Sequence, residues 1–205
     1  MEYNIISSGS DGNCVIVNEN IMIDCGIKAK EFNKIDISKI KYVLITHSHG
    51  DHIKKSNIKK LLSRTIYVNR DTFDKYADVL VLAKKVVILD VNEVYKIGEF
   101  NMIPFEVYHD VQCHGFSFIG QEISVLYSTD LARVEDLPDL QYDYIFLEAN
   151  YDLNKIIKAS EDKRYKSRVK SNFRHLSKQD SLKYVSCHLK KGGKYEPLHK
   201  SKEFY

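Results

Sequence analysis

The stretch Thr46-His47-Ser48-His49-Gly50-Asp51-His52 decides the fold and the chemistry of this chain. It places three imidazoles and one carboxylate within six residues, directly after the apolar run Tyr42-Val43-Leu44-Ile45. A strand that ends in such a loop directs several ligands to one point, and imidazole with carboxylate suits Zn²⁺, Mn²⁺ or Fe²⁺. Neighbouring side chains on a sharp turn point in different directions, so the loop can serve two ions. A solvated His-rich loop is the alternative, but further candidate ligands downstream favour a metal site.

The bulk composition predicts one soluble domain. The chain has 205 residues, of which 43% are hydrophobic and 29% charged, which is ordinary for a globular protein with a substantial core. No apolar run approaches the roughly 20 residues that span a bilayer. The start, Met1-Glu2-Tyr3-Asn4, lacks the layout of a signal peptide, so we expect a cytoplasmic location without membrane association. The cysteines show no CxxC spacing and are expected to be reduced: Cys14, Cys25, Cys113 and Cys187. A metal role stays open for Cys113 and Cys187, which each neighbour a His.

Charge is spread unevenly along the chain. Residues 154–205 carry 15 Lys or Arg against 5 Asp or Glu, a local balance of +10, whereas residues 1–153 have a balance of −7. The densest basic run covers residues 163–174 and includes Tyr165 and Phe173. A positive segment with aromatic rings near a metal centre suits a phosphate-rich substrate. A solvated helix face explains such a run equally well.

Short apolar runs separated by turns predict an α+β fold. Strands are expected over residues 3–6, 14–17, 21–24, 42–45, 66–68, 86–89, 94–97, 100–108, 115–119, 124–127 and 143–147. Helices are expected over residues 31–40, 54–62, 70–82 and 178–185, the last opened by a capping box of Ser177 with Asp180. This order indicates two layers of sheet covered by helices.

Candidate ligands follow the ends of the expected strands. They are Asp24 after residues 21–23, the His run after 43–45, His109 and Asp110 after 105–108, Asp130 after 125–129, and His188 after 184–187. A single Asp or His at a strand end is usually a cap or turn residue. Five such positions in succession are difficult to explain by chance and favour a metal site.

These motifs together resemble the metallo-β-lactamase superfamily over nearly the whole chain. Within it the chain is most similar to the YycJ-type group, which is related to ribonuclease J and to the transfer-RNA 3′-processing nucleases. The finer match is carried by residues 8–14, Ile23-Asp24-Cys25-Gly26, Ser128-Thr129-Asp130-Leu131, Glu148-Ala149-Asn150 and His175-Leu176-Ser177. The resemblance implies an αββα sandwich and a single hydrolase domain over residues 1–205.

The resemblance also implies two divalent ions, Zn or Mn. The first ion would be held by His47, His49 and His109, the second by Asp51, His52 and His188, with Asp130 bridging both. Asp24 would orient a ligand without touching an ion. His199 is the rival of His188, because the residues that follow His188 depart from the usual family sequence.

The catalytic groups that the resemblance implies lie on both sides of the reacting phosphorus. Asp51 would orient the attacking water and accept its proton. Glu148 would orient His175, and His175 would protonate the departing oxygen; a solvated helix-cap His is the alternative reading of His175. Asn150, which replaces a Thr of the family, and Arg174, a candidate phosphate clamp, would bind the substrate.

These groups predict a metal-dependent hydrolase of phosphodiester bonds that acts as a nuclease on DNA or RNA. A phosphodiesterase for small cyclic or modified nucleotides is the alternative, and a nucleic-acid-binding module with a structural metal centre is the third reading. Only 57 residues separate Asp130 from His188, too few for a clamp-type insertion. The chain must therefore hold its substrate with surface residues or a partner subunit, so a homodimer is one expectation.

Overall fold

The computed structural model describes residues 1–160 and 174–205, and backbone contacts divide the chain into two compact units. Unit 1 comprises residues 1–93 and 111–114, and unit 2 comprises residues 94–110 and 115–205. Except for Arg174, the basic run of residues 163–174 lies outside the described residues. The described residues form two six-stranded sheets.

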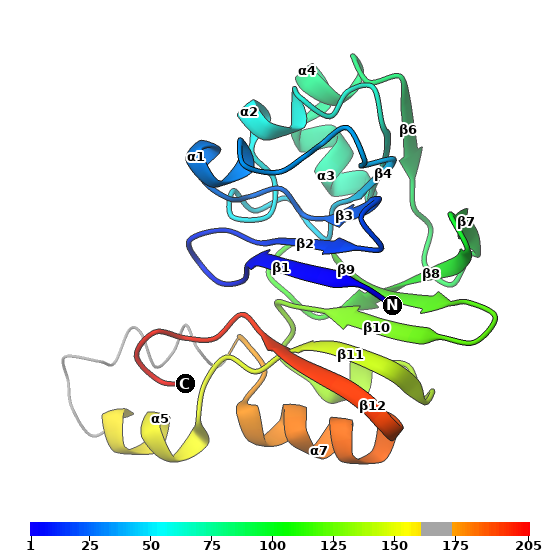
Figure 1. Cartoon of the computed structure of the whole chain (residues 1–205). Helices are drawn as coiled ribbons and strands as arrows, with labels where there is room; N and C mark the ends of the chain where they lie inside the picture. Colours follow the sequence, from blue (N-terminus) through cyan, green and yellow to red (C-terminus); the bar gives the residue numbers. More distant parts are fainter. Residues whose placement is uncertain (161–173) are drawn as a thin grey trace. The chain divides into compact units, whose positions relative to one another are not determined.

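The sheet of unit 1 changes from antiparallel to parallel along the chain (Figure 1). Its strands, in sheet order, are β1 (Tyr3–Ser7), β2 (Cys14–Val17), β3 (Ile21–Ile23), β4 (Tyr42–Leu44), β5 (Thr65–Val68) and β6 (Lys85–Ile88). The pairs from β1 to β3 are antiparallel, and those from β3 to β6 are parallel. Parallel neighbours need crossover connections. These contain α1 (Ala29–Phe32), α2 (Lys55–Ile58), α3 (Arg70–Lys75) and α4 (Ala77–Leu80).

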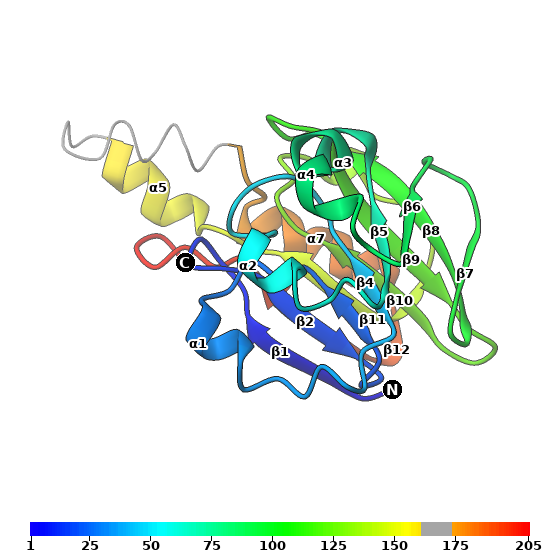
Figure 2. The ribbon, with the colours of Figure 1, turned by 90° about the horizontal axis from the view of Figure 1, so that it is seen from above.

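One face of this sheet packs against the short helices. Met22, Val43 and Ile66 share a buried apolar cluster with Phe32 of α1 and Leu80 of α4. Figure 2 shows α3 and α4 beside β5 and β6. The alternate residues of the strands, such as Ile21, Leu44 and Tyr67, are buried too. Both faces of the parallel strands are therefore covered, as their continuous Val and Ile content requires.

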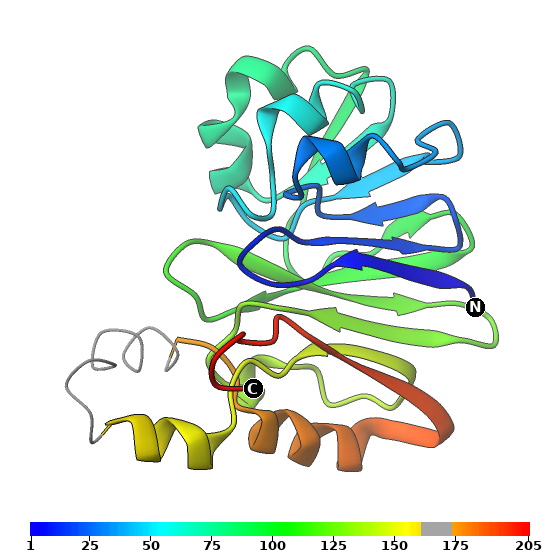
Figure 3. The same ribbon diagram turned by 60° about the vertical axis from the view of Figure 1, so that its left-hand side comes forward.

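The sheet of unit 2 has three parallel strands at one edge. In sheet order its strands are β12 (Leu189–Leu198), β11 (Tyr142–Glu148), β10 (Ser124–Ser128), β9 (Cys113–Ile119), β8 (Phe100–Val107) and β7 (Tyr95–Ile97). β12, β11 and β10 run parallel, whereas β9 is antiparallel to β10 and β7 to β8. The helical elements among the described residues of this unit are η1 (Val134–Asp136), α5 (Leu153–Ser160) and α7 (Lys178–His188). α7 lies alongside β11 and β12 (Figure 3).

The end of α7 corrects one expected strand. The predicted cap is confirmed, because the Ser177 hydroxyl accepts a hydrogen bond from the Asp180 amide at 3.0 Å. The helix continues to His188, however, so the strand predicted over residues 184–187 is wrong. Ser181, Tyr184 and Val185 are the buried residues of α7, and their spacing is helical. The last strand of the chain is instead β12, and its Lys- and Gly-rich sequence lacks the apolar residues typical of a strand.

Other expectations are met with shorter elements. The helix predicted over residues 31–40 is confined to α1, and the one over 70–82 divides at Tyr76 into α3 and α4.

All four cysteines are free thiols, and only Cys187 is exposed. Within residues 1–160 and 174–205, no helix combines the length and apolarity needed to cross a membrane.

Candidate metal and catalytic site

The candidate site residues follow the carboxyl ends of parallel strands. In unit 1, Asp24 follows β3, and residues 46–52, here called the His loop, follow its parallel neighbour β4. In unit 2, Asp130 follows β10, Glu148 ends β11, and His199 follows β12. Parallel neighbours end at the same edge of a sheet, which is where sites form in open sheets. Each sheet thus collects its own set of ligand-type side chains.

Asp24 anchors the His loop of unit 1. Its fully buried carboxylate accepts hydrogen bonds from the Thr46 amide at 2.9 Å and from His52 Nδ1 at 2.7 Å. The Thr46 hydroxyl also donates to it, at 3.0 and 3.1 Å. Burial raises the pKa of Asp24, although His52 and Thr46 act in the opposite direction. A proton on Nδ1 of His52 leaves Nε2 with the lone pair that a metal needs.

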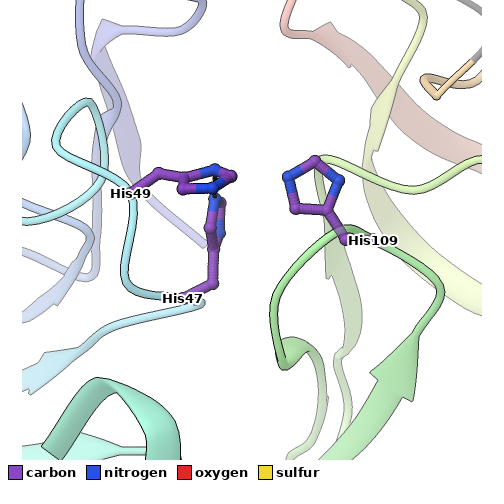
Figure 4. A group of neighbouring side chains, drawn as sticks. All are labelled: His47, His49 and His109. Carbon is purple, nitrogen blue, oxygen red and sulfur yellow. Dashed lines mark hydrogen bonds between the residues drawn. The ribbon is translucent and has the colours of Figure 1, made fainter. Parts of the chain in front are cut away.

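The imidazoles of the His loop lie against one another. His47 Nε2 is 3.1 Å from His49 Nδ1, and the two ring centroids are 4.7 Å apart. The rings of His47 and His52 are 4.0 Å apart. Figure 4 shows His47 and His49 projecting from the loop after β4. His47 and His52 are fully buried, whereas the side chain of Asp51 is 28% exposed.

Two neighbouring segments hold the His loop in place. Asn13 donates its amide to His52 Nε2 at 2.8 Å and its backbone N–H to the Asp51 carbonyl at 2.7 Å. Gly26 lies so close that a Cβ there would be 1.8 Å from the Asp51 carbonyl oxygen, so only glycine fits. Sequence reasoning used Asn13 and Gly26 only as family markers. Their contacts give both residues a supporting role at the loop.

Glu148 is the centre of the set in unit 2. Its Oε1 accepts hydrogen bonds from His175 Nδ1 at 2.8 Å and from His199 Nδ1 at 2.9 Å. Its Oε2 accepts the backbone N–H of Leu131 at 2.9 Å. Asp130, Glu148, His175 and His199 offer ligand atoms that all lie within 4.8 Å of one another. One buried carboxylate therefore fixes two imidazoles beside a second carboxylate.

Electrostatics in unit 2 favour charged imidazoles. Burial by itself would raise the pKa of Glu148, but His175 and His199 hold it below its ordinary value. Burial would lower the pKa of His175, yet the charges of Glu148 and Asp130 raise it to about 9. The pKa of His199 is raised for the same reason, with Asp130 contributing most against burial. His175 can thus carry a proton at neutral pH.

His109 and Arg174 both contact Asp110. His109 follows β8 (Figure 4), and its Nε2 is 3.1 Å from Asp110 Oδ1. Arg174 donates to Asp110 Oδ2 at 3.2 Å. The rings of His109 and His175 are 6.0 Å apart, so His109 belongs to the same edge of unit 2.

His188 lies away from this set, contrary to its predicted place at a strand end. It ends α7, stacks on Tyr184 with ring centroids 3.9 Å apart, and directs Nε2 to Asp139 at 3.1 Å. The physical reason is that residues 184–187 are helical, so no strand end presents His188 to the site edge. His199, its rival, follows the true strand β12 and contacts Glu148 and Asp130.

Asn150 is directed to the protein interior. Its amide donates to the His199 carbonyl at 2.7 Å, and its side chain is 5% exposed. Its backbone N–H donates to the Leu176 carbonyl at 2.8 Å. Asn150 therefore ties the His199 turn to the segment that carries His175.

The donor chemistry of both sets fits divalent ions. Each set combines buried imidazoles with carboxylates, the ligands that Zn²⁺ and Mn²⁺ accept. In each, a buried carboxylate contacts Nδ1 of an imidazole, Asp24 with His52 and Glu148 with His199, as an orienting partner of a metal-ligating His does. Two mixed sheets with such sets at their strand ends define a metal-dependent hydrolase of the metallo-β-lactamase type.

The chain belongs to the beta-lactamase superfamily, whose domain model matches residues 19–160. Among curated proteins it is 26% identical to exodeoxyribonuclease WalJ of Streptococcus pneumoniae over 87% of this chain and 73% of the relative. It is 21% identical to exodeoxyribonuclease YycJ of Bacillus anthracis, over 88% of this chain and 75% of the relative. The predicted resemblance to the YycJ-type group is confirmed.

Solved structures of the same fold cover nearly the whole chain. The metallo-beta-lactamase fold protein YhfI of Bacillus subtilis superposes with a TM-score of 0.74 at 16% identity, over 98% of this chain and 86% of that one. Human tRNase Z, short form, superposes with a TM-score of 0.70 at 17% identity, over 98% and 93% of the two chains. The predicted α+β metallo-β-lactamase fold is therefore confirmed, and this fold implies divalent metal ions.

Proposed function

We propose that this protein is a nuclease that hydrolyses phosphodiester bonds of DNA or RNA with the help of two divalent ions. The observation that carries the proposal is the pairing of Glu148 with His175 beside Asp130 in unit 2. A β-lactamase needs no such proton donor on the leaving-group side. The names of the curated relatives, both exodeoxyribonucleases, support the same class of substrate.

We propose that the ligands implied by the family resemblance hold the ions, with His199 in place of His188. The proposed ligands are His47, His49, Asp51, His52, His109, Asp130 and His199. Zn²⁺ and Mn²⁺ both suit this set. When bound, the ions would lower the pKa of a water toward neutrality and offset charge on the phosphate oxygens. Asp24 would keep His52 in its ligating orientation, and Asn13 would have to release Nε2 of His52 to the ion.

Asp51 acts on the attacking side of the proposed reaction. Its side chain is partly exposed, and Asn13 and Gly26 hold its backbone carbonyl. A partly exposed carboxylate on a fixed backbone can orient the attacking water and accept its proton.

His175 acts on the leaving-group side. Glu148 fixes Nδ1, so Nε2 carries the proton toward the departing oxygen. A pKa of about 9 keeps this imidazole protonated at neutral pH, as a general acid requires. The contact with Glu148 favours this role over a solvated helix-cap histidine, because only 17% of the His175 side chain is exposed.

Asn150 and Arg174, both predicted to contact the substrate, have different roles in this proposal. The inward-facing amide of Asn150 favours a positioning role, through the His199 turn, over direct contact with substrate. Arg174 stays a proposed phosphate ligand, but it would have to exchange Asp110 for the phosphate.

The test is cleavage of 5′- and 3′-labelled DNA and RNA oligonucleotides with Mn²⁺ and Zn²⁺ supplied separately. We expect metal-dependent cleavage of at least one polymer, abolished in Asp51→Ala and His175→Ala. Turnover confined to cyclic or modified mononucleotides would instead support the small-nucleotide phosphodiesterase. Stoichiometric metal with no ester hydrolysis at all would support a binding module and contradict the proposal.

Three further expectations remain proposals: one hydrolase domain over residues 1–205 without a clamp-type insertion, a homodimer, and a cytoplasmic location. Light scattering of the purified protein tests the dimer directly. Limited proteolysis tests the domain, because a single domain should yield no stable fragment smaller than the chain.

A further inference from the structure

A network of backbone hydrogen bonds surrounds Glu148 in unit 2 and joins three segments of the chain. The Asn150 amide donates to the Leu176 carbonyl, and the Ser201 amide donates to the Asn150 carbonyl, each at 2.8 Å. The Lys178 amide donates to the Tyr151 carbonyl, also at 2.8 Å. The segments that carry His175 and His199 are thereby fixed to the end of β11.

The same network carries two lysines to one aromatic ring. Lys178 follows His175 by three residues, and Lys200 directly follows His199. Their ammonium groups each lie 5.0 Å from the ring centroid of Tyr205. A third lysine, Lys155 of α5, donates to the Tyr205 carbonyl oxygen. We call Lys178 and Lys200 the lysine pair, and Tyr205 provides the ring that both contact.

Cation–π contact holds an ammonium group without neutralising it. Lys200 is exposed and Lys178 half-buried. A carboxylate that interacts with Lys178 is Asp152, which also accepts a hydrogen bond from the Asn154 amide at 2.8 Å. Arg174 differs from this pair, because Asp110 binds it directly at 3.2 Å.

We propose that Lys178 and Lys200 bind a phosphate of a polynucleotide strand next to the bond that is cleaved. The chain length places the Lys178 Cα within about 11 Å of the His175 Cα. The strand would thus be held at two places, at the reacting phosphate and at a neighbouring one. This proposal rests on the proposed nuclease function. It specifies that the substrate is a polymer and not a mononucleotide.

Binding to the pair can be measured without turnover. A fluorescein-labelled single-stranded DNA 12-mer is titrated with wild-type protein in EDTA at several salt concentrations, and anisotropy is recorded. The Lys178→Gln/Lys200→Gln double variant should bind roughly 10-fold more weakly. Its plot of log affinity against log salt should lose about 0.7 of its slope, since the pair binds one phosphate and each phosphate contact on a single strand contributes about 0.7.

The matched control is Lys183→Gln/Lys194→Gln, which removes the same charge from exposed positions of α7 and β12. Equal losses in both double variants would mean a general charge effect and would overturn the proposal. No loss in the Lys178/Lys200 variant would also overturn it. Competition by inorganic phosphate as effective as by the same phosphate concentration in an oligonucleotide would indicate a free-anion site and contradict a polymer.

A second readout separates this inference from the proposed function. With metal present, the selectivity for oligonucleotide over bis-p-nitrophenyl phosphate should fall about 10-fold in the Lys178/Lys200 variant, because the small ester has no neighbouring phosphate. If no ester is cleaved by any form of the protein, the proposed function fails. The metal-free binding difference would still decide whether the lysine pair holds a strand.

Discussion

The two units gather their ligand-type side chains in contrasting ways. In unit 1, His47, His49, Asp51 and His52 come from one loop, and Asp24 of the neighbouring strand holds it. In unit 2, the group around Glu148 comes from segments separated by up to 69 positions, from Asp130 to His199. In both units, a buried carboxylate accepts a hydrogen bond from Nδ1 of an imidazole. The comparison teaches that the orienting carboxylate is common to both, whereas the assembly is local in one unit and depends on sheet topology in the other.

The two orienting carboxylates, Asp24 and Glu148, also differ in the direction of their pKa shifts, and the number of imidazoles in contact with each explains why. Asp24 meets one imidazole, and burial raises its pKa. Glu148 meets two, and together they hold its pKa below the ordinary value. Glu148 therefore stays ionised and can sustain the charge on His175.

The largest expected effect tests which histidine belongs to the set of unit 2. His199→Ala should lose about one bound metal equivalent and about 10³-fold in nuclease turnover, because a proposed ligand is removed. Metal analysis and initial rates measure both. His188→Ala is the matched comparison, with turnover within about twofold of wild type and a loss of about 1 kcal/mol of stability from its stacking on Tyr184. The reverse pattern would restore His188 as the ligand.

A smaller effect is expected for Glu148→Gln. We predict about a 100-fold lower kcat, because the general acid loses its orienting charge. The wild-type rate should fall as the pH rises through about 9, where His175 loses its proton. Without the Glu148 charge, burial acts against the imidazolium, so this alkaline limb should move to lower pH. A pH–rate profile with an unmoved limb would contradict the role of Glu148.

In unit 1, Asp24→Asn should have a weaker effect, about 10- to 30-fold on metal affinity. The amide can still accept from Thr46 but no longer offers a charged acceptor to His52. Metal titration monitored by calorimetry measures the loss. Rates at saturating metal should recover, which distinguishes weaker binding from a damaged catalytic group.

The last prediction concerns stability and not activity. His114 is a buried histidine of unit 1, and within residues 1–160 and 174–205 neither of its ring nitrogens has a hydrogen-bond partner. Burial lowers its pKa to about 4, opposite to His175. The unfolded chain then binds more protons between pH 6.5 and 4, so stability should decrease as the pH falls, by up to about 3 kcal/mol. In urea unfolding, the free energy of unfolding of His114→Leu should decrease between pH 6.5 and 4 by about 3 kcal/mol less than that of wild type. Parallel pH curves for the two proteins would refute the assignment.

The sequence by itself determined the fold class and the ligand-type side chains that gather in the His loop of unit 1. The His loop needs no tertiary information, because its donors are neighbours in the chain and follow a recognisable apolar strand. Asp24, Asp130 and Glu148 were also predictable, since each lies at or just beyond the end of a clear Val-, Ile- or Leu-rich strand. The pairing of Glu148 with His175 was inferred from a family resemblance, and the structure places the two atoms 2.8 Å apart.

Only the tertiary structure showed that His199, and not His188, lies beside Glu148 and Asp130. Residues 184–187 are apolar enough to resemble a strand, but helical spacing buries them in α7. The strand that does reach the site, β12, contains Lys190, Lys191, Lys194 and two glycines, and it forms because β11 pairs with it in parallel. Strand pairing supplies hydrogen bonds that local composition does not reveal. Local chemistry therefore indicated which residue types form each set, whereas the pairing of distant strands determined that His199, and not His188, lies beside Glu148.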